Sequence, residues 1–433
     1  MSEGAPLLFR NARLIDPEGG AEFPGAILVA EGRIAEILPG PLAQGAPGGA
    51  EIVECGEKCL APGIIDFGVK IGEPGERHKE SFRSGGLAAA AGGVTTMVTR
   101  PDTEPAIDTP EILEFVHRRA REVAPVHVLP MAALTKGRAG REMTEIGLLR
   151  DAGAVAFTDG MRSQENTRVL LRALTYAGAA GALVMLHPQE PVLSAGAAAT
   201  SGAFATKLGL PPVPAMAEAM ELARLLALAG MAGARVHFDQ LSTAAALPLL
   251  KGAKAEGLKV TAGASIHHLT LNEFDLGEYR TFFRLTPPLR SEEDRAALVQ
   301  AVADGLIDLI GSFHTPQDEE SKRLPFEEAA PGAVGLETLL PAALQLWHAG
   351  AVSLPRLFAC LALNPARLLG LPAGRLAPGA PADLVLFDPD QPFVLNRYDL
   401  KSKAKNTPFD LTRMQGRVLG TWVGGRRVFG GGA

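Results

Sequence analysis

The sequence predicts an α/β protein in which a (β/α)8 barrel is joined to a small composite β-sandwich. Two observations favour this fold. Short apolar runs alternate with helical patterns through the middle of the 433-residue chain, and β-like runs broken by Gly and Pro occupy both ends. A doubly wound open sheet is the competing architecture, but no GxGxxG motif follows the first apolar run of the middle region.

Eight apolar runs in the middle of the chain are candidate barrel strands. Helical stretches such as 110–122, 215–230 and 291–305 separate them. Eight strands joined by right-handed crossovers close naturally into a barrel. The candidate strands are 63–67, 94–98, 126–132, 154–158, 182–187, 234–238, 258–262 and 307–312.

The β-like runs at the two ends predict one domain built from both termini. Runs within residues 1–60 are matched by β-like stretches at 381–389 and 416–429. We therefore expect residues 1–60 to form the first part of the β-sandwich, residues 61–374 the barrel and residues 375–433 the second part of the β-sandwich.

Composition excludes several classes of partner. The net charge of −6 argues against nucleic acid and anionic membranes, which favour basic surfaces. The chain has no apolar run of about 18 residues and its N-terminus lacks the pattern of a signal peptide, so we expect a soluble cytoplasmic protein. Cys55, Cys59 and Cys360 show no metal-binding spacing and are expected to be buried thiols.

Functional residues of a barrel enzyme follow the C-terminal ends of its strands. A metal hydrolase needs several His and carboxylate side chains to converge there, and this chain offers few. In strand order the residues at these ends are Gly68, Lys70, Asp102, Lys136, Asp159, His187, Asp239, Gln240, His267, His268, Phe313 and His314.

Several stretches at these strand ends resemble the dihydroorotases, within the larger family of cyclic amidohydrolases. They include APGIIDFGV, GEPGERHKESFRSGGLAAAAGGVTTMV, RPDTEPAIDTPE, AGAVAFTDG, VTAGASIHHLTL and ADLVLFDP, and they occur in the family's order along nearly the whole chain. The resemblance implies the barrel fold and, for active members, a zinc-dependent hydrolase.

The first strand departs from the active pattern. Active members carry Asp-x-His-x-His followed by Arg-Glu-Pro-Gly, in which both histidines bind zinc. Here Gly68 and Lys70 occupy the two histidine positions, and Gly72 occupies that of the arginine that binds the substrate carboxylate. Glycine offers no lone pair and an ammonium group repels a dication, so neither replacement can bind zinc.

Other strand ends depart as well. By the same resemblance Asp102 replaces a substrate-binding Asn, Gln240 a metal-binding His, and Phe313 the Asp that acts as general base. Only Asp159 and His187 keep the family's metal-ligand types, fewer than the three that catalytic zinc sites usually have. Loss of a general base costs roughly 10²–10⁴-fold in rate. We therefore expect no catalytic residue, bound metal or cofactor.

The remaining polar residues allow structural interpretations. Lys70 could pair with Asp159 and so offset the burial of both charges. His237 and Asp239 share one face of a strand and are more easily explained as structural residues than as a metal pair. His267 and His268 match the family's support for the strand-seven loop, and His314 is expected to be a solvated or hydrogen-bonded remnant. Two further segments are expected to be a charged surface loop and a structural or interfacial stretch, 315–331 and 401–410.

The resemblance is closest to the non-catalytic dihydroorotase-like chain that some bacteria pair with aspartate carbamoyltransferase, where it holds the transferase trimers in a larger complex. The runs 67–69 and 237–242 carry this resemblance. It implies an assembly subunit of pyrimidine biosynthesis that is itself a homo-oligomer. Two alternatives stay open. One is a sensor that binds a pyrimidine or carbamoyl aspartate; the other is an active zinc hydrolase with a displaced ligand set, Asp159, His187, His237 and Asp239.

Overall fold

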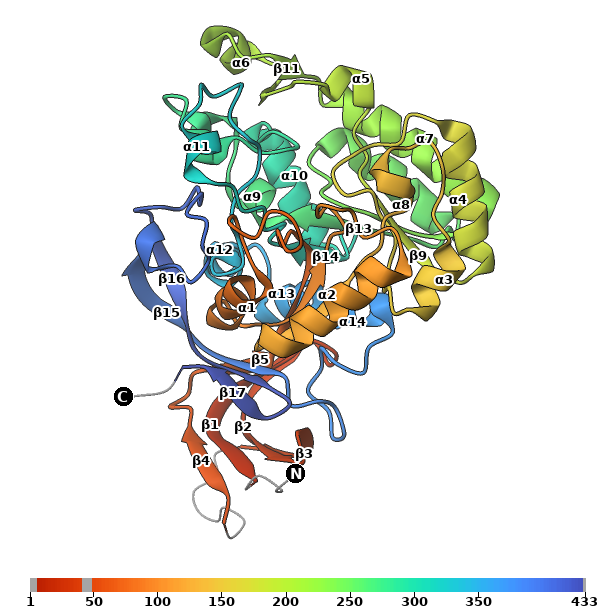
Figure 1. Cartoon of the computed structure of the whole chain (residues 1–433). Helices are drawn as coiled ribbons and strands as arrows, with labels where there is room; N and C mark the ends of the chain where they lie inside the picture. The colour runs from red at the N-terminus through yellow and green to blue at the C-terminus, as the bar shows by residue number, and fades with distance from the viewer. Residues whose placement is uncertain (1–5, 41–48, 431–433) are drawn as a thin grey trace.

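The structure is a computed structural model that describes residues 6–40 and 49–430 (Figure 1). Parts of the predicted segments 1–60 and 375–433, namely residues 1–5, 41–48 and 431–433, lie outside the described residues. The expectation of no signal peptide rests partly on residues 1–5. The predicted fold class is confirmed. A (β/α)8 barrel is joined to a β-rich domain that contains strands from both ends of the chain.

The barrel strands follow one another around the barrel in chain order. They form two parallel sheets, β6-β7-β8 and β9-β12-β13-β14. Phe157, in the predicted strand 154–158, connects the two sheets through single bridges to Ala132 and Val184. The strands are β6 (Ile64–Val69), β7 (Val94–Thr99), β8 (His127–Pro130), β9 (Leu183–Leu186), β12 (Arg235–Phe238), β13 (Val260–Ser265) and β14 (Leu309–Gly311).

Polar contacts join the last barrel strand to the first. The backbone N–H of Ser312 donates to Asp66 Oδ1 at 2.7 Å, and the Ser312 hydroxyl donates to Oδ2 of the same carboxylate. Beyond them, the N–H of Lys70 donates to the carbonyl oxygen of His314 at 2.8 Å. Burial raises the pKa of Asp66 to about 7, although the hydrogen bonds from Ser312 oppose the shift.

Helices cover the outside of the barrel, and several begin at residues that suit a helix N-terminus. The Ser81 and Ser84 side chains form a reciprocal capping box, Pro110 occupies the first turn of its helix, and Ser291 accepts a hydrogen bond from Asp294 N–H. The helices are α1 (Phe82–Ala91), α2 (Pro110–Val123), α3 (Ile146–Asp151), α4 (Thr167–Ala179), α7 (Met216–Ala232), α8 (Leu247–Ala255), α9 (Ile266–Thr270), α10 (Glu292–Ala303), α11 (Glu319–Lys322), α12 (Leu339–His348), α13 (Leu354–Phe358) and α14 (Asn364–Leu369).

An excursion between β9 and α7, residues 191–213, extends away from the barrel at the top of Figure 1. Its two short strands pair in parallel, with Ala199 opposite Pro212. It packs on the barrel loops through a separate apolar cluster that includes Leu210, Leu276 and Phe283. The excursion comprises α5 (Pro191–Ser194), β10 (Ala199–Thr200), α6 (Ala203–Leu208) and β11 (Pro212–Val213).

The strands from both chain ends form one continuous eight-stranded sheet (Figure 1). N- and C-terminal strands meet where Ala61 pairs with Val385. Phe9 packs against the edge of the Trp422 ring, with centroids 4.8 Å apart, in a core shared by both ends. The strands are β1 (Leu7–Asp16), β2 (Ala21–Ala30), β3 (Arg33–Pro39), β4 (Glu51–Glu54), β5 (Cys59–Pro62), β15 (Leu384–Val394), β16 (Arg413–Val423) and β17 (Arg426–Phe429).

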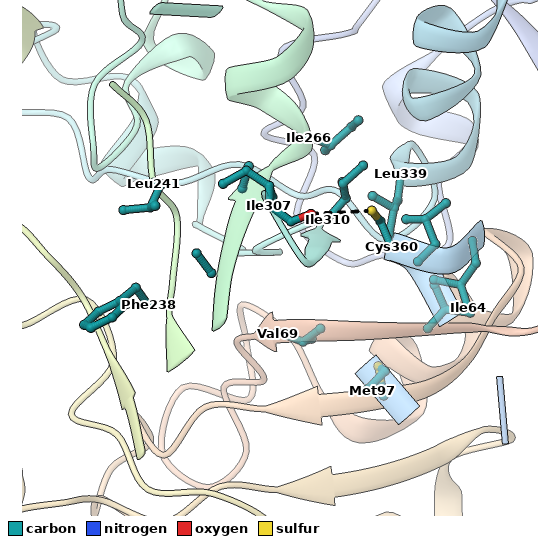
Figure 2. Packing of buried hydrophobic residues seen from close by; sticks show 14 of the residues in the cluster. Ile64, Val69, Met97, Phe238, Leu241, Ile266, Ile307, Ile310, Leu339 and Cys360 are labelled. Atoms are coloured by element: carbon teal, nitrogen blue, oxygen red, sulfur yellow. Dashed lines mark hydrogen bonds between the residues drawn. The ribbon is translucent and has the colours of Figure 1, made fainter. Parts of the chain in front are cut away.

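The main apolar core lies between the barrel strands and their helices. Figure 2 shows Cys360 beside Leu339 and Ile310 in this core, and its thiol lies 4.0 Å from the carbonyl oxygen of Ile307. The expectation of buried thiols is confirmed for all three cysteines, which are buried and unpaired. Burial raises the pKa of each thiol to about 12, so none is a reactive thiolate.

No helix in residues 6–40 or 49–430 combines the length and the apolar character needed to cross a membrane.

Candidate functional site

The Phe313 ring occupies the space beside Gly68. Gly68 has a φ of +73°, and a Cβ added there would lie 2.5 Å from Phe313 Cδ1. Phe313 itself is buried and has a φ of +46°, a left-handed conformation that costs roughly 1–3 kcal/mol in a non-glycine residue. A histidine at position 68 would therefore meet two obstacles, the left-handed backbone conformation of this position and the Phe313 ring.

The predicted pairing of Lys70 with Asp159 is wrong. Lys70 Nζ lies 2.7 Å from Glu76 Oε2, and Lys79 Nζ lies 2.5 Å from the other oxygen of the same carboxylate. The two lysines lower the pKa of Glu76 although its burial acts to raise it. The turn after β6 brings Glu76 back to the strand end, so Lys70 has a nearby partner and does not reach across the barrel.

Gly72 is closely covered by the same turn. A Cβ at this position would lie 2.2 Å from the carbonyl oxygen of Glu76. Backbone atoms cannot move aside as a flexible side chain can, so any larger residue here would require a different turn. The replacement of the family's arginine by Gly72 therefore accompanies a tighter path of the chain.

Asp102 lies among cationic groups. Arg100 Nη2 is 3.2 Å and Arg138 Nη1 3.8 Å from Asp102 Oδ2. Burial acts to raise the pKa of Asp102, but Arg100, Lys70 and Arg138 outweigh it and lower the pKa overall. Asp102 thus neutralises part of this positive charge. The buried Arg100 was not among the predicted site residues, although a charged residue two positions after the apolar run 94–98 is a signal of a polar strand end.

Asp159 is held by hydrogen bonds to its neighbours. Its Oδ1 accepts from the N–H groups of Leu134 and Thr135, both at 3.0 Å, and its Oδ2 accepts from the Thr135 hydroxyl at 2.6 Å and from the Gln164 side chain. Burial raises its pKa, and these hydrogen bonds oppose the shift. A carboxylate with both oxygens engaged in this way fixes the loops after two strands and has a structural role without a metal.

His187 pairs with Asp239. Its Nδ1 lies 2.9 Å from Asp239 Oδ1, and both residues are fully buried. Gln240 points elsewhere, and its side-chain nitrogen lies 2.8 Å from the Met161 sulfur. The structure therefore brings together two of the four residues in the displaced ligand set, His187 and Asp239.

The other histidines have structural surroundings. His237 Nδ1 lies 2.9 Å from the Thr261 hydroxyl, and burial lowers its pKa to about 3. His268 Nε2 is 3.2 Å from the carbonyl oxygens of Pro287 and Pro288. These contacts engage one nitrogen of each ring in structural hydrogen bonds.

Two more histidines lie at the ends of the last two strands. His267 stacks on Phe409, with ring centroids 5.8 Å apart. His314 is fully buried, accepts a hydrogen bond from Gly335 N–H at 3.2 Å and lies 3.5 Å from Glu80, so it is hydrogen-bonded and not solvated. Lys136 is exposed and pairs with Glu142 outside the site.

The side chains present do not fit the zinc site of the family. No group of three or more His, Cys, Asp or Glu among the described residues is arranged to hold a metal ion. Gly68, Lys70 and Phe313 supply no ligand, and Asp159 uses both oxygens in hydrogen bonds.

A central cavity of about 280 Å³ remains at the barrel mouth, lined by Lys70, Arg100, Asp102, Gln240 and Phe313. Within the described part of the chain, Arg100 Nη1 and His267 Nε2 have no hydrogen-bond partner. The cavity thus offers cationic and polar contacts to a small ligand.

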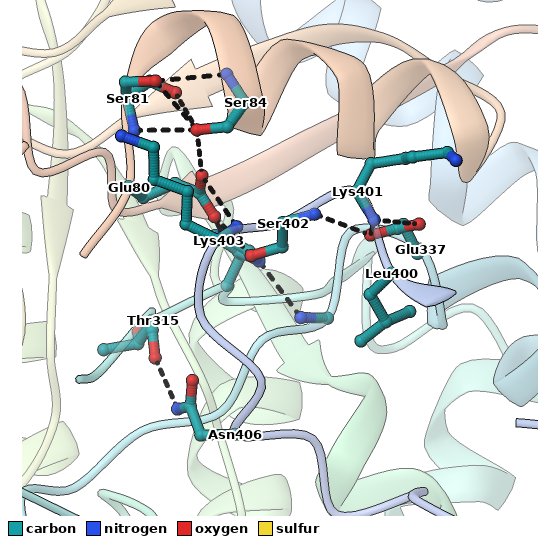
Figure 3. Close-up of polar contacts among 12 residues, drawn as sticks. Glu80, Ser81, Ser84, Thr315, Glu337, Leu400, Lys401, Ser402, Lys403 and Asn406 are labelled. Atoms are coloured by element: carbon teal, nitrogen blue, oxygen red, sulfur yellow. Dashed lines mark hydrogen bonds and ion pairs between the residues drawn. The ribbon is translucent and has the colours of Figure 1, made fainter. Parts of the chain in front are cut away.

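The segment 401–406 fastens the C-terminal region to the barrel (Figure 3). Ser402 donates to the buried Glu80 carboxylate, which also accepts from Ser84. The N–H of Lys401 donates to Glu337 at 2.8 Å, and the Asn406 side chain donates to the carbonyl oxygen of Thr315 at 3.1 Å. The basic stretch 401–410 therefore has the structural role that was expected for it.

The segment 315–331 is less exposed than the sequence suggested. It contains the short helix α11, and Lys322, Phe326 and Ala329 within it are buried. The prediction of a plain surface loop is therefore wrong for these residues; Lys322 Nζ, for example, donates to the carbonyl oxygen of Thr281 at 3.1 Å. Other residues of the segment, including Glu319 and Arg323, are exposed and pair with each other.

Comparisons with known proteins identify the family of the chain. A family model described as dihydro-orotase-like matches residues 57–246, and an amidohydrolase family model matches residues 337–429. A dihydroorotase-like protein of Pseudomonas aeruginosa is 40% identical over 419 residues, which are 96% of this chain and 97% of the relative. The dihydroorotase of Syntrophobacter fumaroxidans is 37% identical over 423 residues, 98% of this chain and 96% of the relative.

A solved structure gives the same answer for the fold. The L-hydantoinase (dihydropyrimidinase) of Arthrobacter aurescens superposes with a TM-score of 0.89 at 25% identity, covering 99% of this chain and 97% of that one. Sequence and structure thus agree along nearly the whole length, and the chain belongs to the dihydroorotase-like family of amidohydrolases.

Proposed function

We propose that this chain is a dihydroorotase-like protein of pyrimidine biosynthesis that has no hydrolase activity and serves as an assembly subunit of aspartate carbamoyltransferase. The observation that carries the loss of activity is the Phe313 ring beside Gly68, 2.5 Å from where a Cβ would lie. The family's general base and one of its zinc ligands are thus both replaced, and the replacements pack against each other.

The chemistry of cyclic amide hydrolysis supports the same conclusion. A metal-dependent hydrolase uses its metal to generate hydroxide near neutral pH, and a general base accepts the proton. Lys70 and Gln240, at two further zinc positions, contact Glu76 and Met161. Relatives that bear the name dihydroorotase share the fold, but a fold does not carry a chemistry without the side chains that perform it.

The assembly role rests on the family resemblance. The runs 67–69 and 237–242 match the non-catalytic chain that accompanies aspartate carbamoyltransferase, and one relative, 40% identical, is named dihydroorotase-like and not dihydroorotase. A homo-oligomer in the cytoplasm, without nucleic acid or membrane partners, completes the proposal.

An activity assay tests the catalytic half. The purified chain is supplied with zinc, and dihydroorotate hydrolysis and bound metal are measured beside the Syntrophobacter fumaroxidans dihydroorotase as positive control. We expect neither turnover nor stoichiometric zinc. Stoichiometric zinc with turnover would establish the alternative, an active hydrolase with a displaced ligand set.

Size-exclusion chromatography tests the assembly half. The chain is run with and without the aspartate carbamoyltransferase of the same organism, at low and moderate salt. We expect a shared peak that is larger than either protein alone. Separate elution at both salt concentrations would contradict the assembly role and leave the catalytic conclusion intact.

The central cavity favours one second candidate, a non-catalytic pyrimidine sensor. Its wall contains Arg100, whose Nη1 has no partner among the described residues, next to Lys70. Calorimetric titration with dihydroorotate and with carbamoyl aspartate tests this candidate. Binding without turnover would support the sensor, and the absence of heat for both compounds would exclude it.

A further inference from the structure

A second and larger cavity lies beside the central one. It has a volume of about 580 Å³ and is bounded by the loops after β8, after residues 154–158 and after β9, with the 191–213 excursion forming another wall. The two cavities share only Met161 and Thr286 among their lining residues. We call the larger one the lateral cavity.

The wall of the lateral cavity is cationic. Arg138, Arg141 and Arg162 line it, and Glu165 is the acidic residue among the lining side chains. The Arg138 guanidinium is half-buried, and its nearest carboxylate oxygen, on Asp102, is 3.8 Å away. Burial lowers the pKa of Arg138, and Arg162 lowers it further while Asp102 opposes the shift.

Arg162 lies close to Arg138 and carries the same positive charge. Its Nη1 donates to the Arg138 carbonyl oxygen at 3.3 Å, and within the described residues neither Arg141 nor Arg162 has a carboxylate partner within 4.0 Å. Arg141 and Arg162 are exposed, so water screens part of the repulsion among these three cationic side chains, but the cavity wall they line remains positive. A bound anion would relieve this repulsion, and arginine is well suited to recognise phosphate and carboxylate groups through paired hydrogen bonds.

Among the described residues, His187 presents an unpartnered ring nitrogen to this wall. Its Nδ1 is engaged with Asp239, while its Nε2 is buried and has no partner in the described part of the chain. A neutral imidazole that donates from Nδ1 to a carboxylate presents Nε2 as an acceptor. A ligand that satisfies this nitrogen needs an O–H or N–H donor of its own.

The wall beside His187 is rigidly supported. Gln189, which also lines the cavity, donates to the buried Glu218 carboxylate at 2.9 Å and accepts from Arg290 at 3.3 Å. Glu218 in turn accepts hydrogen bonds from the backbone N–H groups of Ser242 and Thr243, each at 2.9 Å. This side of the cavity is therefore held in place without a ligand.

We propose that the lateral cavity binds a small dianion that carries a hydroxyl or N–H donor, such as hydrogen phosphate or a hydroxy-dicarboxylate. The guanidinium groups of Arg138, Arg141 and Arg162 hold the two negative charges, and His187 Nε2 accepts the ligand's donated hydrogen bond. This site does not depend on the proposed assembly role or on the central cavity.

Calorimetric titration of the full chain tests the proposal with three probes at low salt: inorganic phosphate, malate and succinate. Malate and succinate have the same charge and differ by one hydroxyl. We expect malate and phosphate to bind with a dissociation constant of about 1 mM or tighter, and succinate to bind several-fold more weakly than malate.

Arginine variants locate the site. In Arg162→Ala and in Arg141→Ala we expect malate affinity to fall by about tenfold, because each variant loses a charge-assisted hydrogen bond. The matched control is Arg168→Ala, which removes an exposed arginine at the start of α4 that does not line the cavity. Malate affinity should be unchanged in this control.

Three outcomes would overturn the proposal. They are the absence of binding by all three probes, equal losses in Arg162→Ala and Arg168→Ala, and malate affinity that is unchanged in both cavity variants. Equal affinity for malate and succinate would remove His187 from the site. Arg141 and Arg162 are exposed, and the thermal unfolding midpoint of each variant without ligand checks that it folds normally.

Discussion

The two halves of the barrel mouth have changed in different ways. Around β6 and β14 the metal-ligand types are gone, and their space is filled by the Phe313 ring and by the ion pair of Lys70 with Glu76. Around residues 154–158 and β9 the side chains Asp159 and His187 are retained, and a cavity of about 580 Å³ lies beside them. We call these the closed half and the open half.

The comparison of the two halves shows that a residue type can be kept while its side chain makes purely structural contacts. Asp159 and His187 keep the family's residue types, yet Asp159 accepts hydrogen bonds from Leu134 and Thr135, and His187 pairs with Asp239. In the open half, Asp159 and His187 thus make structural hydrogen bonds. In the closed half, the Phe313 ring packs against Gly68, and Lys70 pairs with Glu76. The two halves should respond differently to substitution.

The largest effect is expected behind the open half, at Glu218. This carboxylate is fully buried and accepts hydrogen bonds from Gln189, Ser242 and Thr243. Glu218→Ala leaves these donors and the nearby Arg290 without their partner, so we expect a loss of about 3–5 kcal/mol in the free energy of unfolding, measured by urea denaturation. Glu218→Gln keeps the size and one acceptor and should lose less; equal losses would show that volume alone matters.

The closed half is probed at Gly68. Gly68→Ala forces a non-glycine residue to a φ of +73° and places its Cβ against Phe313, so we expect a loss of about 2–4 kcal/mol. In a Phe313→Ala background the steric part disappears. The double-mutant cycle should therefore show a coupling of about 1–3 kcal/mol, and strictly additive losses would contradict the packing described for this half.

A pH experiment examines His237, below both halves. Burial lowers its folded pKa to about 3, below its ordinary value of 6.5. Between these values the unfolded chain binds the extra proton, so this contribution to stability is present above about pH 6.5 and is lost as the pH falls toward 3. From about pH 6 to about pH 4 the stability difference between wild type and His237→Asn should change by about 1.4 kcal/mol per pH unit, to the disadvantage of wild type. A pH-independent difference would show that His237 is not buried in its neutral form.

The smallest effect is expected at Lys70. Its ion pair with Glu76 is partly exposed, and Glu76 keeps Lys79 as a second partner. Lys70→Met should change the free energy of unfolding by no more than about 1 kcal/mol, as measured by urea denaturation. A loss as large as that of Glu218→Ala would mean that the closed half depends on charge and not on packing.

The sequence predicted the barrel well because its signals are local. All eight apolar runs lie at barrel strands, although 154–158 forms only single bridges through Phe157. The 191–213 excursion was not foreseen, since its small residues show no clear period and its strands have two residues each. Its position depends on apolar contacts with distant residues such as Phe283.

The sequence predicts which residue types occupy the site, but not which side chains contact one another. The residue types at positions 68, 70, 240 and 313 can be read from the sequence, and Gly, Lys, Gln and Phe are not the usual ligands of a catalytic zinc. The partner of Lys70 cannot be read in this way, because it depends on how the turn after β6 returns Glu76 to the strand end. The cationic wall of the lateral cavity was missed because Arg138 and Arg141 follow β8 whereas Arg162 belongs to the next loop, and the two loops border one cavity only in the folded chain.

The contact between Ser402 and Glu80 has a consequence for how the protein is made. It joins residues 322 positions apart, and it satisfies a carboxylate that is buried at the start of the first barrel helix. During synthesis from the N-terminus, that carboxylate has no Ser402 to pair with until almost the whole chain has left the ribosome. This contact therefore forms only when synthesis is almost complete, and a chain truncated before residue 402 would leave Glu80 with Ser84 and His314 but without this hydrogen bond, a local weakness that limited proteolysis would detect.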